Sequence, residues 1–527
     1  MSAHSRLCLI TAAALLALPA TNLRAQTATA PDADNIIPGR YIVVYRNSIP
    51  GDAETRTVLA GARLLQRHDR LGIVTVQGPT GTGSPAASRL AQQATQDDQT
   101  AMRQLAAQPN VEYVFHDRIV TAHRLHVRPV PKSQDPTFSV VIGPAASYDT
   151  YYNSPQGWAV RQAGGYGNSI PGGPASGPWN ATTGKGVRIA ILDSGIDASH
   201  PDLSPNVGLN LSEIDPTVLP SICDDASPSD QDGHGTWTAS LAAAALGPGT
   251  GRLIGVAPSA TLLNIKVLER MPLTMPTANE TARCTAGTAS GLLSWVIQGI
   301  DHAIANHADV ISMSLGVVID LSTGDGAGVK AAFDRVTYAA AQAGAVLVAA
   351  AGNDGYDLTN SRYIEIPAQS RNVLAVTAST NPDCIENTSS GAACLPGPPS
   401  LAYYSNRGAP LNALAAPGGS YPTGADMAVS GWIRGACSSG IPNTSDGLPT
   451  DSSHSFGCFN LGHTAYVQAI GTSASAPLVA GAVALLRSVH PEWDPTRVIN
   501  ALRATANPPT TTLPIPQINT AGALNQP

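Results

Sequence analysis

The chain has 527 residues, of which 43% are hydrophobic and only 13% charged, and its net charge at pH 7 is −7. This length exceeds that of a usual single domain and predicts two or three folded units. The hydrophobic content excludes a wholly disordered chain. The acidic balance argues against a nucleic-acid partner, which would require a basic face.

An apolar run at 7–18 follows His4 and Arg6 and precedes small residues that end near Ala25. The run has the length of a signal-peptide core and is too short to span a bilayer. We therefore expect residues 1–25 to be a signal peptide and the protein to be secreted, outside the cell or into the periplasm, with no membrane partner. A buried N-terminal helix is the alternative.

The next predicted unit is small and of the α+β type. An apolar strand at 41–45 opens it, a helix at 88–107 follows, and a strand at 111–115 closes it. We assign it residues 36–123 and call it the N-terminal unit. A proline-rich stretch without periodicity, 124–150, is typical of a linker, and we expect it to include the start of the mature chain.

The remaining residues, 151–527, form the predicted C-terminal unit. Its apolar runs lie at 187–192, 260–268, 309–315, 345–351 and 372–378, and its helix-like segments at 236–246, 289–307, 327–343 and 475–488. Apolar runs without alternation are typical of strands buried on both faces. The alternation of strands and helices therefore predicts an α/β fold, a mostly parallel sheet with helices on both faces.

Six cysteines remain once the signal peptide is removed. An even number in an exported chain favours disulfides. Because nearest neighbours would each staple one long loop, we predict the pairs Cys223–Cys284, Cys384–Cys394 and Cys437–Cys458. The cysteines lack metal-ligand spacing, so we expect no structural zinc site.

Four polar residues lie where a parallel sheet binds its ligands, beyond the carboxyl ends of strands, or at the start of helices. They are Asp193 after the strand at 187–192, His234 in DGHGT, Asn353 after the strand at 345–351, and Ser473 in GTSASAP. Each alone could be a cap, a loop residue or a turn residue. Four together, each bracketed by glycine or small residues that let a substrate backbone approach, indicate a catalytic site.

The blocks around Asp193, His234 and Ser473, in that order, resemble the subtilisin family of serine proteases. The similarity extends over most of residues 185–510. It implies a secreted serine endopeptidase in which Ser473 attacks the scissile carbonyl, His234 takes its proton, and Asp193 orients the imidazole. A non-catalytic binding protein on the same fold is the competing hypothesis.

The resemblance implies further site residues and partners. The Asn353 amide would belong to the oxyanion hole, and Ser314, Leu315 and Gly316 would bind a peptide substrate as an added strand. The N-terminal unit resembles the family's prodomain, an inhibitor and folding aid, which implies an autoprocessed precursor; an independent binding domain is the alternative.

The family's calcium sites are less well matched. The loop at 247–253 lacks their usual ligands, and Asp202 is as plausibly a cap as a ligand. We therefore assign no metal-binding residue and require no cofactor, while calcium remains possible as a structural ion.

The resemblance also suggests a specificity residue. In the family, the residue two before the proline that follows AAGN lies near the base of the pocket for the side chain preceding the cleaved bond. Here the proline is Pro367 and the residue is Glu365. A carboxylate there would favour Lys or Arg, since an unpaired buried charge is costly, and the end of the N-terminal unit at 123–124 is basic. The alternative is that Glu365 is solvated or paired with Arg362 or Arg371.

Overall fold

The computed structural model describes residues 35–78, 88–123, 152, 157–169, 175–247, 253–274, 278–359, 361–380, 385–386, 399–419, 429–430, 433–441, 459–461 and 464–527. The predicted signal peptide, the linker at 124–150 and the cysteines Cys384, Cys394 and Cys458 lie outside them.

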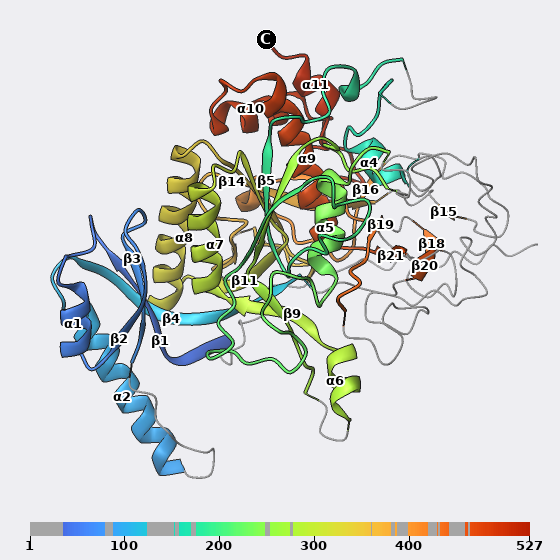
Figure 1. The fold of residues 1–527 in the computed structure, drawn as a ribbon. Coiled ribbons are helices and arrows are strands. Elements are labelled where there is room, and N and C mark those ends of the chain that lie inside the picture. Colours follow the sequence, from blue (N-terminus) through green and yellow to red (C-terminus); the bar gives the residue numbers. More distant parts are fainter. Residues whose placement is uncertain are drawn as a thin grey trace, which may run out of the picture.

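A mostly parallel sheet forms the centre of the C-terminal unit (Figure 1), in the order β16-β14-β12-β10-β5-β7-β6 with β17 beside β14. Its strands are β5 (Arg188–Asp193), β6 (Val207–Ser212), β7 (Thr261–Lys266), β10 (Val310–Met313), β12 (Val346–Ala350), β14 (Val373–Thr380), β16 (Ser400–Leu401) and β17 (Leu414–Pro417). Among these strands, only the pairing of β14 with β16 is antiparallel. The predicted α/β fold class is confirmed.

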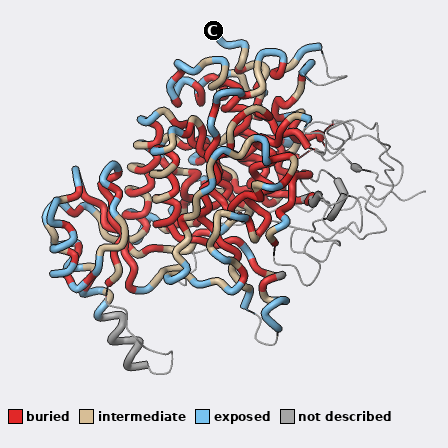
Figure 2. The backbone as a smooth tube through the Cα atoms, viewed as in Figure 1, coloured by how far each residue is buried: buried red, intermediate tan, exposed pale blue. Residues whose placement is uncertain are grey.

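Helices cover both faces of this sheet. One face packs against α5 (His234–Ala243), α9 (Thr472–Val489), α10 (Pro495–Thr505) and α11 (Thr520–Leu524), and the other against α7 (Leu293–Ala305) and α8 (Gly324–Gln342). Strand β5 shows why the apolar runs do not alternate: Ile189 and Ile191 lie in the first core, Ala190 and Leu192 in the second. Figure 2 shows the buried chain concentrated in this central region.

Helix α9 is the one helix among the described residues that is long and apolar enough to cross a membrane. However, 83% of its apolar window is buried inside the protein. Its composition is therefore accounted for by its place in the core.

One predicted helix begins later than expected. Residues 288–292 form strand β9 (Thr288–Leu292), and α7 starts only at Leu293, so the expected helix over 289–307 is wrong in its first turn. β9 pairs with β8 (Leu268–Met271) and with β4 of the N-terminal unit, and these pairings hold its backbone extended. A short helix, α6 (Glu280–Thr285), lies in the segment that precedes β9.

Shorter elements complete the C-terminal unit. They are α4 (Trp158–Gln162), β11 (Leu315–Asp320), β13 (Tyr363–Ile366), β15 (Ile385–Glu386), β18 (Val429–Ser430), β19 (Ile433–Ala436), β20 (Phe459–Leu461) and β21 (Thr464–Ala469), with 3-10 turns at Pro178–Asn180 and Ala409–Leu411. Of these, β11 and β13 matter for the site, because they pair with each other and β11 also pairs with β4.

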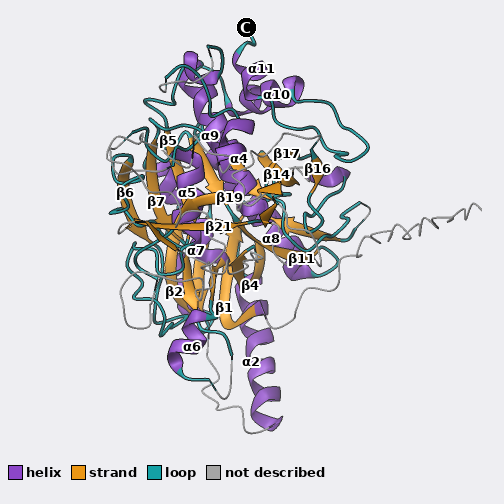
Figure 3. Cartoon of the chain, turned by 90° about the vertical axis from the view of Figure 1, so that its right-hand side faces the viewer, coloured by secondary structure: helices purple, strands orange, loops and turns teal. Residues whose placement is uncertain are grey.

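The N-terminal unit is α+β, as predicted. Its antiparallel sheet has the order β4-β1-β3-β2, and its elements are β1 (Ile36–Tyr45), α1 (Ala53–Leu59), β2 (Arg63–His68), β3 (Ile73–Gln77), α2 (Ser88–Ala106) and β4 (Val111–Ala122). Figure 3 shows α2 extending away from the C-terminal unit. In β1, Tyr41 and Val43 pack within the N-terminal unit, while Ile42 and Val44 share the core of α7 and α8. The unit is thus attached through one face of its sheet.

Strand β4 is longer than the predicted strand at 111–115. Its first half pairs with β1, and its second half continues beyond the N-terminal sheet to lie between β9 and β11 (Figure 1). The extension has polar residues whose partners lie on the C-terminal unit: Asp117 accepts a hydrogen bond from the backbone N–H of Ser294, in the first turn of α7. Such partners cannot be recognised from local sequence.

Candidate active site

The predicted site residues gather at the carboxyl end of the parallel sheet. Asp193 ends β5, and Ser314 follows directly after the neighbouring strand β10. His234 begins α5 and Ser473 lies in the first turn of α9, and these two helices pack against each other. These four separate segments therefore meet at one edge of the sheet.

Asp193 and His234 form a buried pair. His234 Nδ1 donates a hydrogen bond to Asp193 Oδ1 over 2.6 Å, and both side chains are 1% exposed. Asp193 also accepts from the backbone N–H of Ser194 at 2.7 Å and from the hydroxyl of Thr238 at 3.2 Å. Burial alone would lower the pKa of His234, but the carboxylates, Asp193 foremost, outweigh it and raise that pKa.

Asp230 positions the helix that begins with the site histidine. Its buried carboxylate accepts from the hydroxyl of Ser194 at 2.9 Å and from the backbone N–H of Thr236 at 2.9 Å, so it ties α5 to the end of β5. At Gly235 an added Cβ would lie 2.1 Å from the carbonyl oxygen of Gly195. The second glycine in DGHGT is therefore required by the close approach of the start of α5 to the loop that follows β5.

Ser473 is anchored to the residue that follows β10. Its hydroxyl donates to the carbonyl of Ser314 at 3.3 Å, and the hydroxyl of Ser314 donates to the carbonyl of Ser473 at 3.0 Å. Asn353 Oδ1 accepts from the backbone N–H of Thr472 at 2.9 Å and from its hydroxyl at 2.8 Å. These bonds fix the side-chain amide of Asn353 beside the start of α9. The sequence reasoning missed Thr472, although it stands next to Ser473 in the quoted motif.

A segment of the chain itself lies along the predicted peptide-binding strand. In β11, Leu315 and Gly316 pair with Ala122 and Thr121 of β4. On the other side of β4 lies β9, which pairs with it through Ile119↔Leu292, Val120↔Gly291 and Thr121↔Ser290. The sequence reasoning missed β9 because it assigned these residues to a helix.

Glu365 lies on β13, beside β11, and is 1% exposed. Its Oε1 lies 3.7 Å from Nε2 of His123, the residue that follows β4. Arg362 pairs instead with Asp320 at 3.2 Å, and Arg371 lies over a tyrosine ring. The alternative of a solvated or arginine-paired Glu365 is therefore wrong.

No metal site is evident among the described residues: they contain no group of three or more His, Cys, Asp or Glu placed to hold an ion. The carboxylate of Asp202 is buried and accepts a hydrogen bond from the hydroxyl of Tyr466 at 2.9 Å. A structural calcium ion stays a prediction, since residues 248–252 of the relevant loop lie outside the described part.

The predicted disulfide Cys223–Cys284 is confirmed. Cys437 is also disulfide-bonded, to a cysteine outside the described residues, so its pairing with Cys458 stays a prediction, as does Cys384–Cys394.

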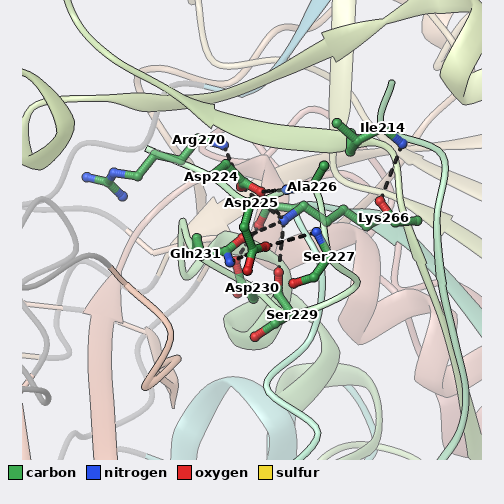
Figure 4. A network of polar contacts seen from close by, with 12 residues as sticks. Ile214, Asp224, Asp225, Ala226, Ser227, Ser229, Asp230, Gln231, Lys266 and Arg270 are labelled. Atoms are coloured by element: carbon green, nitrogen blue, oxygen red, sulfur yellow. Dashed lines mark hydrogen bonds and ion pairs between the residues drawn. The ribbon is translucent and has the colours of Figure 1, made fainter. Parts of the chain in front are cut away.

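Next to the first bridge, the ammonium of Lys266 is completely buried and donates to Asp224, to the carbonyl of Ser229 and to the side chain of Gln231 (Figure 4).

We expect Cys223→Ser combined with Cys284→Ser to lower the free energy of unfolding by about 2–5 kcal/mol, because the bridge restricts the unfolded chain over a sequence separation of 61 residues. Urea unfolding of the full chain, made inactive by Ser473→Ala in both proteins compared, measures the change. An unchanged midpoint would show that the bridge contributes nothing.

The architecture and the site define an α/β protein with an Asp–His pair and an anchored serine at the carboxyl edge of its sheet. The family model described as the Subtilase family matches residues 184–523, and the chain belongs to this family.

Subtilisin E of Bacillus subtilis (strain 168) is 32% identical over 326 residues, which cover 62% of this chain and 61% of that protein. The match thus spans less than two thirds of the relative's length. Among solved structures, fervidolysin from Fervidobacterium pennivorans is similar with a TM-score of 0.60 and 19% identity, covering 94% of this chain and 62% of that one. The epidermin leader peptide processing serine protease of Staphylococcus aureus has a TM-score of 0.56 and 20% identity, covering 92% and 97%. These two structures support the fold.

Proposed function

We propose that the chain is the precursor of a secreted serine endopeptidase, with Ser473, His234 and Asp193 as its catalytic residues. The observation that supports this most is the buried hydrogen bond of 2.6 Å between Asp193 and His234. Helix α5, which begins with His234, packs against α9, which has Ser473 in its first turn. A protein that only binds peptides would have no need for this pair.

The chemistry follows from the atoms. With Nδ1 of His234 donating to Asp193, the opposite nitrogen, Nε2, is the base that takes the proton from the hydroxyl of Ser473. Ser473 attacks the scissile carbonyl, and Asp193 stabilises the imidazolium that forms. The backbone N–H of Ser473 and the amide of Asn353, held by Thr472, stabilise the oxyanion.

The N-terminal unit acts in this proposal as an inhibitor, because its last strand, β4, pairs with the predicted peptide-binding strand β11 and, on its other side, with β9. Activation then requires cleavage of the precursor and release of this unit. Export is supported by the apolar run at 7–18 and by the disulfide Cys223–Cys284, since disulfides persist in oxidising compartments.

Labelling with a fluorophosphonate probe tests the catalytic assignment. We expect the processed protein to be labelled at Ser473, and Ser473→Ala to abolish the label. The matched control is Ser475→Ala in the same motif; this buried hydroxyl donates to the carbonyls of Ala416 and Pro417, and its loss should leave labelling intact. Absence of label on the processed wild-type protein would favour the non-catalytic binding protein.

His116 is one of the side chains that link the N-terminal unit to the C-terminal unit. Its Nδ1 lies 2.6 Å from Asp325 in the first turn of α8, and its Nε2 lies 2.9 Å from Asp98 of α2. Arg118 also reaches Asp325, at 3.4 Å, and the ring of Tyr41 lies beside His116. Burial would lower the pKa of His116, but the hydrogen bonds to the two aspartates raise it. The protonated ring therefore joins the two units.

We expect the contribution of protonated His116 to the stability of the precursor to be fully present below the ordinary histidine pKa of about 6.5. It should be lost as pH rises through the raised pKa of His116. At acid pH this contribution ends when Asp325 takes up a proton. Burial raises the pKa of Asp325, but His116 lowers it overall, so the carboxylate stays charged down to a pH below the ordinary aspartate pKa.

The measurement compares thermal unfolding of the Ser473→Ala precursor with the same chain carrying His116→Gln. The free energy of unfolding of the two proteins should differ by about 1.5–3 kcal/mol near pH 6, and this difference should shrink toward pH 9. A difference that does not depend on pH would contradict the prediction.

A further inference from the structure

We propose that the precursor is cut directly after His123 and that the site around Glu365 selects histidine at the position preceding the cleaved bond. This inference rests on the proposed protease function and names the substrate class of the same site. We call Glu365 and Gly316, with the space that His123 fills between them, the Glu365 site.

The register of β4 supports the position of the cut. The strand pairs with β11 as far as Ala122, so His123 is the first residue beyond the ladder, and its side chain is only 7% exposed. The charge of His234 affects the pKa of His123, which places the two rings near each other. The residue that enters the Glu365 site thus lies within electrostatic range of the candidate catalytic base.

The Glu365 site fits an imidazole ring closely. The carboxyl Oε1 lies 3.7 Å from His123 Nε2, slightly beyond hydrogen-bonding distance. A Cβ added at Gly316 would lie 2.1 Å from Oε1 and 2.9 Å from Nε2. Only glycine therefore leaves room on β11 for both groups. Neither carboxyl oxygen of Glu365, nor His123 Nε2, has a hydrogen-bond partner among the described residues, so each is available to the other.

The two groups have complementary proton requirements. Burial, followed by the charge of Asp354, raises the pKa of Glu365 well above its ordinary value, and burial lowers the pKa of His123 to about 4. Both shifts favour the uncharged forms, and a protonated carboxyl can donate a hydrogen bond to an uncharged ring nitrogen. Histidine satisfies this donor without bringing a charge into the buried site.

Other side chains fit this site less well. Phenylalanine has no acceptor and leaves the buried carboxyl unpaired, which costs free energy. Lysine and arginine bring a permanent charge, and pairing with it requires Glu365 to ionise against the effect of burial. The proposed preference for histidine therefore replaces the preference for Lys or Arg that the sequence suggested.

The cleavage step balances as ordinary acyl transfer. Ser473 Oγ bonds to the carbonyl carbon of His123 while its proton passes to His234 Nε2, and that proton then leaves with the amine of the following residue. Water hydrolyses the acyl-enzyme, which frees Ser473 and leaves a carboxylate on His123.

The first test uses the wild-type precursor and needs no variant. Intact-mass analysis of the fragments released by self-cleavage should show an N-terminal fragment ending at His123. His123→Phe in the full chain should slow this cleavage by about tenfold or more, since it removes the acceptor. A fragment ending elsewhere in the wild-type protein would overturn the assigned position.

The second test uses peptides with the sequence Ile-Val-Thr-Ala-X before the cleaved bond, where X is His, Phe or Arg. We expect the processed enzyme to have a kcat/KM for His at least about tenfold higher than for Phe or Arg. Glu365→Leu should remove the preference for His over Phe, whereas Glu365→Gln, which keeps an N–H donor, should retain part of it. Glu213→Gln, a buried carboxyl that pairs with His302, serves as a control that leaves the ratio unchanged.

The outcomes separate the two proposals. If no peptide is hydrolysed and the wild-type precursor stays intact, the protease function itself fails. If peptides are hydrolysed but Phe or Arg is cleaved as well as His, or if Glu365→Leu leaves the ratio unchanged, the selection of histidine fails alone.

Discussion

Ser473→Ala is expected to reduce kcat for peptide hydrolysis by about 10⁶-fold, the order of magnitude known from subtilisin, and to leave the precursor uncut. The side chain is completely buried, and its hydroxyl donates a long hydrogen bond of 3.3 Å to the carbonyl of Ser314. Alanine therefore removes the nucleophile without opening a cavity of consequence, and the variant should fold as the intact chain.

Two measurements check this expectation. Gel electrophoresis over time shows whether the full-length chain persists, and a peptide assay gives the residual rate. Ser475→Ala should process and hydrolyse at nearly the wild-type rate. If the Ser473→Ala precursor is cut at the normal position in pure form, the cleavage is performed by another residue or another protease.

Asp193→Asn is expected to lower kcat by about 10⁴-fold while leaving the fold intact. In the wild-type protein, Oδ1 accepts from both His234 Nδ1 and the backbone N–H of Ser194, and Oδ2 accepts from the hydroxyl of Thr238. An asparagine has one acceptor and one donor in place of two acceptors. If its oxygen keeps the bond to Ser194 and His234, the charge that supports the imidazolium is lost. If its NH2 faces His234, the ring takes the wrong tautomer.

The matched control is Thr238→Val, which removes a hydrogen bond of 3.2 Å to Asp193 but keeps its charge. Its effect on kcat should be small compared with that of Asp193→Asn. The ratio of the two rates at several pH values, measured on the processed enzymes, distinguishes loss of charge from loss of a contact. Equal losses in the two variants would contradict the role assigned to the carboxylate.

Much of the C-terminal unit could be predicted because its signals are local. The run at 187–192 is apolar on both faces because Ile191 and Leu192 point into two different cores. Glycine-bracketed motifs at strand ends and helix starts, such as DGHGT, identified Asp193 and His234, which the structure places 2.6 Å apart. The pair Cys223–Cys284 followed from nearest-neighbour spacing.

The predicted element boundaries that were wrong have a common physical reason. The first turn of the predicted helix at 289–307 is strand β9 because β8 and β4 hydrogen-bond to it, and both partners are distant in sequence. The extension of β4 beyond residue 115 likewise depends on β9 and β11. Local propensity is a weak guide where pairing with another segment satisfies the backbone.

The sequence by itself therefore determined the fold class, the order of the two units and the residues of the candidate catalytic site, because hydrophobic periodicity and motif chemistry act over short stretches of chain. Only the tertiary structure decided where Glu365 lies and what it contacts. The sequence left open a solvated carboxylate or an arginine pair, and packing against β11 instead buries Glu365 beside His123, a residue 242 positions earlier in the chain. Burial and distant partners, which set the proton affinity of such a group, arise only when the chain is folded.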